Sequence, residues 1–271
     1  MTNFIIGDIG NTITKICLVQ SKNYKIKKII YLDSKKIYSK KNLTPVFKKI
    51  IKGNKINKFA LFSSVVPIYK SILKSFLKNK YHIVLKEIKD KKIKKIVKIA
   101  IKNKKQIGSD RIANAVGAYK KYKANSIVLD FGTATTFDVV NKNAVYTGGV
   151  IAPGINLSIE SLSSFADQIP LFLLKKQKKV VGKNTIEALR SGFYWGYLGL
   201  INNIILKIEK ETKKKYKIVF TGGYADLFKT SIIRPFTVDR NITIKGIIEI
   251  FKENKKYLNK WLKKRNLFFV L

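Results

Sequence analysis

Acidic, hydroxyl-bearing and basic side chains surround a glycine turn near the start of the chain, in Asp8-Ile9-Gly10-Asn11-Thr12-Ile13-Thr14-Lys15. The backbone N–H groups of such a turn can surround phosphate oxygens, and glycine allows a close approach. Thr12, Thr14 and Lys15 can add hydroxyl donors and a positive charge, and Asp8 can hold Mg²⁺ directly or through water. An ordinary hairpin with a Gly-Asn turn explains the segment equally well. This segment alone therefore does not distinguish a phosphate-binding turn from a structural one.

A similar turn recurs in Asp130-Phe131-Gly132-Thr133-Ala134-Thr135-Thr136. Its acid stands at the end of a predicted strand, and ligands of α/β proteins bind at that edge of the sheet. A strand rich in threonine would not need the preceding Asp-x-Gly. The presence of one acid-x-Gly turn in each half of the chain therefore favours a phosphate-binding function over a structural one.

A third segment, Gly108-Ser109-Asp110-Arg111, begins a predicted helix. Ser109 and Asp110 are typical of a helix N-terminus. The positive charge of Arg111 is unfavourable in a first turn, so capping does not explain it. We interpret Asp110 as a candidate general base and Arg111 as a binder of an anionic substrate.

Other chemistries are excluded or undecided. The P-loop and G-x-G-x-x-G motifs are absent. The only cysteine, Cys17, and the only histidine, His82, stand in apolar segments without catalytic neighbours, and we interpret both as structural. The glycine-rich turns at 148–154 and 221–223 are either simple turns or places where the backbone approaches a nucleotide.

Hydrophobic patterns predict alternating strands and helices, which indicates an α/β fold. Strands are predicted at 3–8, 13–20, 24–32, 58–62, 125–130, 135–140, 144–150 and 217–220, and helices at 44–52, 69–78, 109–122, 156–163, 185–210 and the C-terminus. Thr44 is the expected N-cap of the first helix. The repeated turn predicts two similar domains, each a mixed sheet with flanking helices, with a cleft between them. The expected domains are 1–115 and 116–271, joined through a helix near 112–124.

The composition suits a globular protein, with 271 residues and 46% hydrophobic content. No apolar run approaches the roughly 18 residues needed to span a bilayer, and the first residues lack signal-peptide features. We expect a cytoplasmic protein without membrane association.

The net charge of +40 suggests nucleic acid as a partner. Only five of the 56 basic residues are arginine, although arginine is the usual reader of bases. The lysines are spread along the chain, and isoleucine and asparagine are also abundant, as an AT-rich coding sequence would produce. We therefore expect no specific nucleic-acid partner. Specific DNA binding would survive moderate salt, whereas binding through bulk charge would not.

Taken together and in this order, the segments resemble the type III pantothenate kinases of the acetate kinase/sugar kinase/Hsp70/actin superfamily. The resemblance runs from Phe4 to about Gly246 and implies two ribonuclease H-like, actin-like domains. It makes residues 8–15 the ATP phosphate motif. It makes Gly108, Ser109, Asp110 and Arg111 a pantothenate-contacting segment with Asp110 as proton acceptor.

The resemblance also implies a monovalent cation, K⁺ or NH₄⁺, at Asp130 and an ATP contact at Thr133. Thr185 in Gly182-Lys183-Asn184-Thr185 matches a substrate-contacting position, and Lys245-Gly246 fits the family pattern. Two positions depart from it: Ile101 stands where the family often has a substrate-packing tyrosine, and Ser109 where alanine is common.

The activity implied is transfer of the γ-phosphate of ATP, with Mg²⁺ and K⁺, to the primary hydroxyl of pantothenate. The product is 4'-phosphopantothenate, in the first step of coenzyme A biosynthesis, and a homodimer is implied. Two alternatives stay open at this point. One is a different phosphotransferase of the superfamily, and the other is a nucleic-acid-binding or regulatory protein that has kept the fold and lost catalysis.

Overall fold

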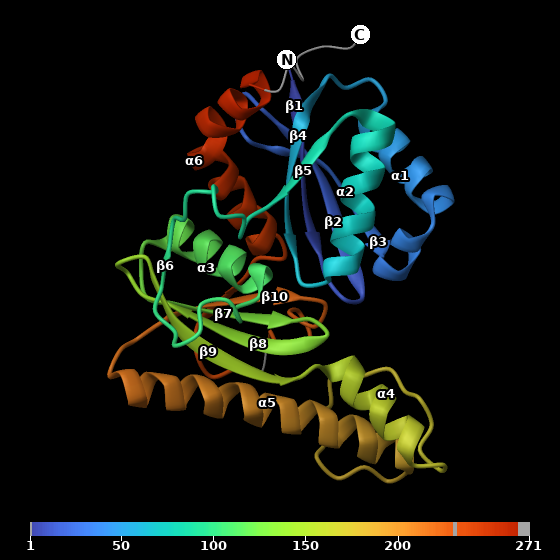
Figure 1. Cartoon of the computed structure of the whole chain (residues 1–271). Coiled ribbons are helices and arrows are strands. Elements are labelled where there is room, and N and C mark those ends of the chain that lie inside the picture. Colours follow the sequence, from blue (N-terminus) through green and yellow to red (C-terminus); the bar gives the residue numbers. More distant parts are fainter. Residues whose placement is uncertain (1, 230–231, 265–271) are drawn as a thin grey trace. The chain divides into compact units, whose positions relative to one another are not determined.

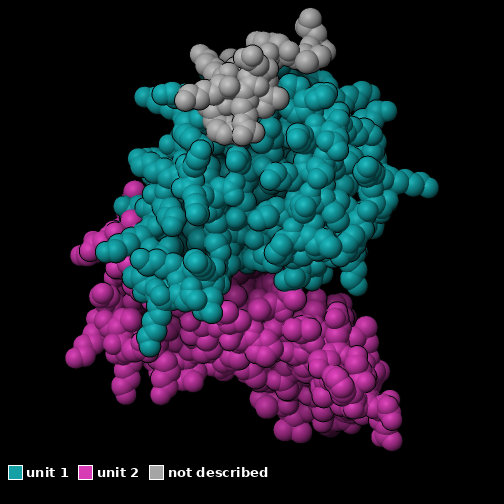
Figure 2. All heavy atoms as spheres, in the orientation of Figure 1, with its two compact units in different colours: residues 1–120, 242–271 teal, residues 121–241 magenta. Residues whose placement is uncertain are grey.

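The computed structural model describes residues 2–229 and 232–264. They form two compact units, one of residues 1–120 with 242–271 and one of residues 121–241, which Figure 2 shows in different colours. Residues 242–264, expected in the second domain, thus belong to the first unit. The division between the units lies inside the predicted hinge helix, α3 (Ser109–Tyr122).

Unit 1 contains a mixed sheet in the order β3-β2-β1-β4-β5 (Figure 1). Strand β2 runs antiparallel to its neighbours β1 and β3, whereas β4 and β5 run parallel to β1. The strands are β1 (Asn3–Ile9), β2 (Ile13–Gln20), β3 (Ile26–Asp33), β4 (Ile56–Ser64) and β5 (Val84–Glu87). The parallel strands end at one edge of the sheet, where the sequence places Asp8.

Helices cover both faces of this sheet because side chains alternate between the faces of each strand. Alternate residues of β1, such as Ile5 and Ile9, pack in one core with α1 (Lys40–Ile51) and α2 (Pro67–Tyr81). On the other face, Phe4 stacks on Phe251 of α6 (Ile242–Lys264), with ring centroids 3.9 Å apart. Figure 1 shows α6 on the face opposite α1 and α2. A 3-10 helix, η1 (Ser34–Tyr38), and a short strand, β6 (Lys98–Ile99), complete the unit.

Unit 2 repeats the strand arrangement of unit 1. Its strands are ordered β9-β8-β7-β10-β11, with β8 antiparallel to its neighbours β7 and β9, and with β10 and β11 parallel to β7. They are β7 (Ser126–Phe131), β8 (Ala134–Val140), β9 (Val145–Pro153), β10 (Lys217–Gly222) and β11 (Phe236–Val238). Helices α4 (Ile155–Phe165) and α5 (Thr185–Thr212) pack on the core face of this sheet. The predicted pair of mixed sheets with flanking helices is confirmed.

Several local predictions need correction. The first helix begins at Lys40 with Ser39 as its N-cap, and the Thr44 hydroxyl donates to the carbonyl of Lys40 rather than capping the helix. The patterns also missed η1, β5, β6 and β11, because very short elements show too little periodicity to be recognised. Cys17 is buried in β2, and burial raises the pKa of its thiol to about 12. Among the described residues, no helix has the length and apolar character needed to cross a membrane.

Candidate active site

The first acid-x-Gly turn connects β1 to β2 at the edge where β1 ends. Asp8 pairs with Lys15 across the hairpin, and Ile9 pairs with Thr14. The N–H of Gly10 donates to the carbonyl of Ile13 at 3.2 Å, which closes the turn and leaves Thr12 exposed at its tip. A β-carbon on Gly10 would lie 2.8 Å from the Ile13 oxygen, so only glycine fits this turn without a shift.

Thr14 supports this turn from beneath. It is fully buried, and its hydroxyl lies 2.8 Å from that of Ser34, which in turn donates to the carbonyl of Gly10. The N–H of Ser34 also donates to the carbonyl of Thr12. Thr14 therefore holds the turn in this structure, although the sequence suggested it as a phosphate donor. No sequence pattern points to Ser34, which is 24 residues from Gly10 and approaches it only because β3 lies beside β2.

Asp8 and Asp110 lie at the same edge of the unit 1 sheet. Asp8 pairs with Ser63 of the parallel strand β4. The hydroxyl of Ser109, the first residue of α3, accepts from the N–H of Ser64 at 2.7 Å and from the hydroxyl of Ser63 at 3.1 Å. These bonds fix the N-terminus of α3 to the end of β4, one strand away from Asp8.

The carboxylate of Asp110 folds back over the start of its own helix. Its Oδ1 accepts from the N–H of Arg111 at 2.8 Å. A β-carbon on Gly108 would lie 2.4 Å from the same oxygen. The helix N-terminus stabilises the negative charge of this side chain. Gly-x-Asp-Arg is thus a local unit in which the glycine leaves room for the carboxylate.

Lys89 supports the loop that leads into this unit and was missed by the sequence analysis. Its ammonium group donates to the carbonyls of Ile107 at 2.7 Å and Lys105 at 3.1 Å. Ile101 is partly buried in the same loop. A single lysine among many gives no signal in the sequence, and only the path of the loop shows its role.

The second acid-x-Gly turn lies at the corresponding edge of unit 2. Asp130 pairs with Thr136 of β8 and with Thr221 of β10. Thr221 is fully buried, and its hydroxyl has no hydrogen-bond partner in the described structure. The sequence indicated Thr221 only as the first residue of a glycine-rich turn. The register of β10 with β7 shows that it lies beside Asp130.

Two glycines bring backbone segments close to this second turn. A β-carbon on Gly154 would lie 2.1 Å from the carbonyl oxygen of Thr133, and one on Gly222, which has φ +86°, would lie 2.5 Å from that of Phe131. The glycine-rich turns therefore pack against residues 131–133. Thr185 lies elsewhere in the unit, exposed in the first turn of α5 behind its N-cap Asn184.

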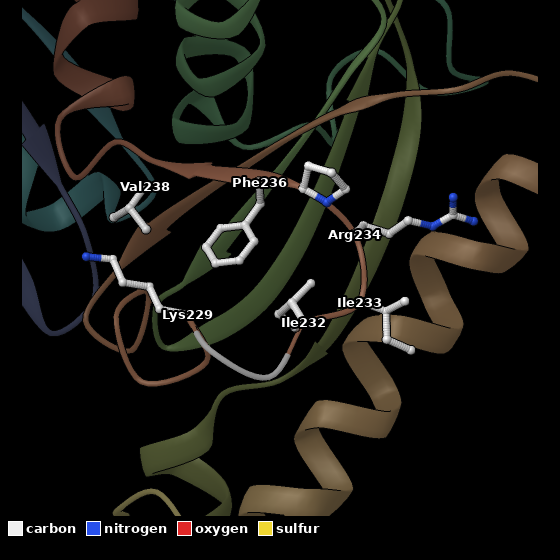
Figure 3. Close-up of a pocket in the computed structure, with 7 residues that line it drawn as sticks. Lys229, Ile232, Ile233, Arg234, Phe236 and Val238 are labelled. Carbon is white, nitrogen blue, oxygen red and sulfur yellow. The ribbon is translucent and has the colours of Figure 1, made fainter.

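The predicted site residues thus form two groups. Residues 8–15 and 108–111 share one sheet edge in unit 1, and Asp130 and Thr133 lie at the matching edge of unit 2. The convergence of Asp8, Asp110 and Asp130 on one cleft stays a prediction. A shallow cavity of about 500 Å³ beside β11 contains none of these residues (Figure 3). It is lined by Lys229, Ile232, Ile233, Arg234, Phe236 and Val238.

Comparison with known proteins identifies the family. A model of the family described as type III pantothenate kinase matches residues 4–207. A relative named type III pantothenate kinase from Pelagibacter ubique is 52% identical over 244 residues, which cover 90% of this chain and 96% of the relative. The chain belongs to the type III pantothenate kinase family. A second member, from Paramagnetospirillum magneticum, is 37% identical over 72% of this chain and 75% of its own length.

Solved structures show that this chain shares its fold with more distant proteins. A protein described as a Baf family transcriptional activator from Campylobacter jejuni superimposes with a TM-score of 0.61 at 22% identity, covering 93% of this chain and 99% of that one. The activator of 2-hydroxyisocaproyl-CoA dehydratase from Clostridium difficile gives 0.54 at 10% identity, covering 96% and 98%. At these identities the likeness extends to the fold alone.

Proposed function

We propose that this chain transfers the γ-phosphate of ATP to the primary hydroxyl of pantothenate, giving 4'-phosphopantothenate for coenzyme A biosynthesis. Membership of the type III pantothenate kinase family carries this proposal. The common sheet edge of the Asp8 turn and the Asp110 helix supports it, because phosphoryl transfer requires the phosphates and the attacking hydroxyl to lie close together.

Asp110 acts in this proposal as the general base. Its carboxylate accepts the proton of the pantothenate hydroxyl while the oxygen of that hydroxyl attacks the γ-phosphorus in line. The transition state of phosphoryl transfer is loose, so the proton can leave late and Asp110 needs no unusual basicity. Arg111 binds the anionic end of pantothenate, Thr185 contacts the substrate, and Ile101 replaces a tyrosine with an aliphatic contact.

The first turn binds the phosphates of ATP in this proposal. Backbone N–H groups at the exposed tip of the turn, around Asn11 and Thr12, and the Thr12 hydroxyl donate to phosphate oxygens, and Lys15 offsets their charge. Thr133 of the second turn contacts ATP. The buried Thr14 keeps the turn in shape through Ser34, which supports an indirect role for it in ATP binding.

The acidic residues suit the cations that this reaction uses. Among the residues that the structure describes, no three His, Cys, Asp or Glu side chains form a metal cluster. A Mg²⁺ ion that retains its waters and is shared with ATP needs only one or two carboxylates, and Asp8 would hold it. The buried, unpartnered hydroxyl of Thr221 beside Asp130 suits an oxygen-ligated monovalent cation, K⁺ or NH₄⁺. Both cations would offset phosphate charge.

A homodimer accounts for the apolar surface of unit 2. Phe165, at the end of α4, is 89% exposed, and Leu171, Leu173, Val180 and Val181 in the following segment are also exposed. Large exposed apolar side chains that occur together are typical of interaction sites, and a second copy of the chain is the proposed partner. The proposed location is the cytoplasm, without a membrane or a specific nucleic acid as partner.

Replacement of Asp110 tests the proposed role of the base. Asp110→Asn removes the proton acceptor with little change in shape, so kcat should fall by about 10²–10⁴-fold while the KM for ATP stays nearly constant. Pantothenate-dependent ATP consumption measures both. Glu211→Gln, at an exposed carboxylate near the end of α5, is the control and should retain full activity. Undiminished kcat in Asp110→Asn would remove this residue from the mechanism.

Dependence on the monovalent cation tests Asp130 separately. We expect faster turnover in K⁺ than in Na⁺ at equal ionic strength, with saturation as K⁺ rises. Asp130→Asn should abolish the difference, because its neutral amide holds a cation weakly. Equal rates in the two salts for the unaltered protein would contradict the proposed cation site.

A further inference from the structure

A buried carboxylate that the proposed mechanism does not use lies at the same edge of the unit 1 sheet as the candidate base. Glu87 is the last residue of β5 and is only 8% exposed. Its Oε1 has no hydrogen-bond partner in the described structure. Carboxylates are rarely buried without full pairing, because loss of hydration is costly. This burial suggests a functional reason to retain the group.

The groups that face Glu87 come from three parts of unit 1. They are Lys70 on α2, the backbone N–H of Lys89 and the carboxylate of Asp90 in the turn after β5, and the hydroxyl of Ser109 on α3. Burial raises the pKa of Glu87, and Asp90 adds to the rise. Lys70, the Lys89 N–H and Ser109 oppose it.

Ser109 is the link between Glu87 and the candidate base. Its hydroxyl oxygen already accepts from Ser64 and Ser63, so its own proton is what it can offer to a further group. That proton is donated to the carbonyl of Ser64 at 2.7 Å. The β4–β5 register places Glu87 beside Phe62, the residue before Ser63, and the Ser109 hydroxyl lies near enough to the Glu87 carboxylate to lower its pKa. The carboxylate of Glu87 is therefore the alternative acceptor for this proton. Asp110 is the next residue of the chain. A change in the hydrogen bonds of Ser109 therefore reaches the first turn of α3 directly.

We propose that Glu87 is a positioning residue of the phosphoryl-transfer site, which acts through Ser109 to hold the first turn of α3 and the Asp110 carboxylate at the sheet edge. The inference rests on the proposed role of Asp110. The ionised form of Glu87 draws the Ser109 proton, and the protonated form releases it to Ser64. Because transfer depends on the position of the base to within about 1 Å, this small change alters turnover.

Glu87→Gln tests the proposal with the shape of the side chain retained. We expect kcat to fall by about tenfold to a hundredfold with the KM for ATP unchanged, as misplacement of a base predicts. Glu253→Gln is the matched control and should leave kcat unchanged. Glu253 lies exposed on α6, where it forms an ion pair with Lys94. An unchanged kcat in Glu87→Gln, or an equal fall in both variants, would overturn the proposal.

Thermal unfolding separates this role from a purely structural one. A carboxyl whose pKa is raised by folding costs stability above that pKa, and the cost disappears as the pH falls towards the unfolded value. At neutral pH the Tm of Glu87→Gln should therefore equal or exceed that of the unaltered protein. A large loss of Tm accompanying the loss of kcat would show that Glu87 only supports the fold.

The pH profile and a double-mutant cycle test the link itself. The acid limb of kcat/KM for pantothenate should move to lower pH in Glu87→Gln, because the group with the raised pKa is gone. In a Ser109→Ala background, Glu87→Gln should have little further effect on kcat. If the acid limb of the pH profile does not move, or if the two substitutions affect kcat independently, Glu87 does not act through Ser109.

Asp110→Asn, measured in parallel, distinguishes the two hypotheses. If Asp110→Asn is inactive and Glu87→Gln is fully active, the proposed role of Glu87 is wrong and the proposed function still holds. Fully active Asp110→Asn removes the base on which this inference rests.

Discussion

Single residues at the start of α3 show how closely the site is packed. Gly108 has no positive φ that would require glycine, yet its missing side chain leaves room for the carboxylate of Asp110. The atom that an added methyl group would meet is at the end of a side chain, not in the backbone. The requirement for glycine is therefore a requirement on the position of Asp110 rather than on the fold.

Gly108→Ala should consequently affect activity more than stability. We expect kcat to fall by about tenfold or more, because the carboxylate must rotate away from its place. The Tm should change by no more than about 2 °C, as a surface substitution of less than about 0.5 kcal/mol would give. Steady-state kinetics and a thermal melt measure the two effects. A variant that loses Tm but retains kcat would contradict this account.

At the scale of elements, α3 is held along its length as well as at its first residue. The α6 helix crosses it closely, and β-carbons on Gly246 and Gly117 would lie 1.9 Å from the Ala113 carbonyl oxygen and 2.4 Å from that of Ile242. Asn114 accepts a hydrogen bond from Thr243 at 2.7 Å in the same contact. The contact explains why α6 belongs to unit 1, although it follows unit 2 in the sequence.

Gly246→Ala tests this helix crossing. Because the added methyl group would overlap backbone, the helices must separate, and we expect a destabilisation of about 1–3 kcal/mol. Denaturant unfolding measures it from the midpoint at constant slope. Gly199→Ala is the control, since Gly199 lies in α5 with open space at its β-carbon and should gain slightly from helix propensity. Equal stability of the two variants would argue against a close crossing.

At the scale of the whole molecule, charge is the dominant feature. Fifty-six basic residues face only 16 acidic ones, and the structure pairs a minority of the lysines. The acidic side chains form ion pairs with nearby basic residues. Asp239 pairs with Lys121 at 2.8 Å, and Glu209 pairs with Arg234 at 2.7 Å. The remaining positive charge repels itself and opposes the compact state.

Salt should therefore stabilise this protein. The screening length falls from about 10 Å at 0.1 M to about 3 Å at 1 M salt. We expect the Tm to rise with NaCl by about 2–4 °C for each kcal/mol of repulsion relieved. KCl and NaCl should give the same rise beyond the range in which K⁺ saturates its site. A Tm that falls or stays constant across this range would show that self-repulsion is not significant.

Much of this protein can be predicted from the sequence because the signals are local. Short apolar runs bounded by turn residues give β1, β2 and β8 nearly to their ends, and Ser109 begins α3 as expected, because a strand or helix depends mainly on its own side chains. The Asp-x-Gly turns and Gly-x-Asp-Arg are equally local, and their order along the chain was sufficient to identify the family.

Only the tertiary structure decides which distant residues support the site. Ser34 reaches Gly10 through the pairing of β3 with β2, Thr221 lies beside Asp130 through the register of β10 with β7, and Glu87 reaches Ser109 at the end of β5. The packing of α6 on unit 1 is of the same kind. No local pattern carries such information, because strand order and helix crossing depend on contacts between segments that are far apart in the chain.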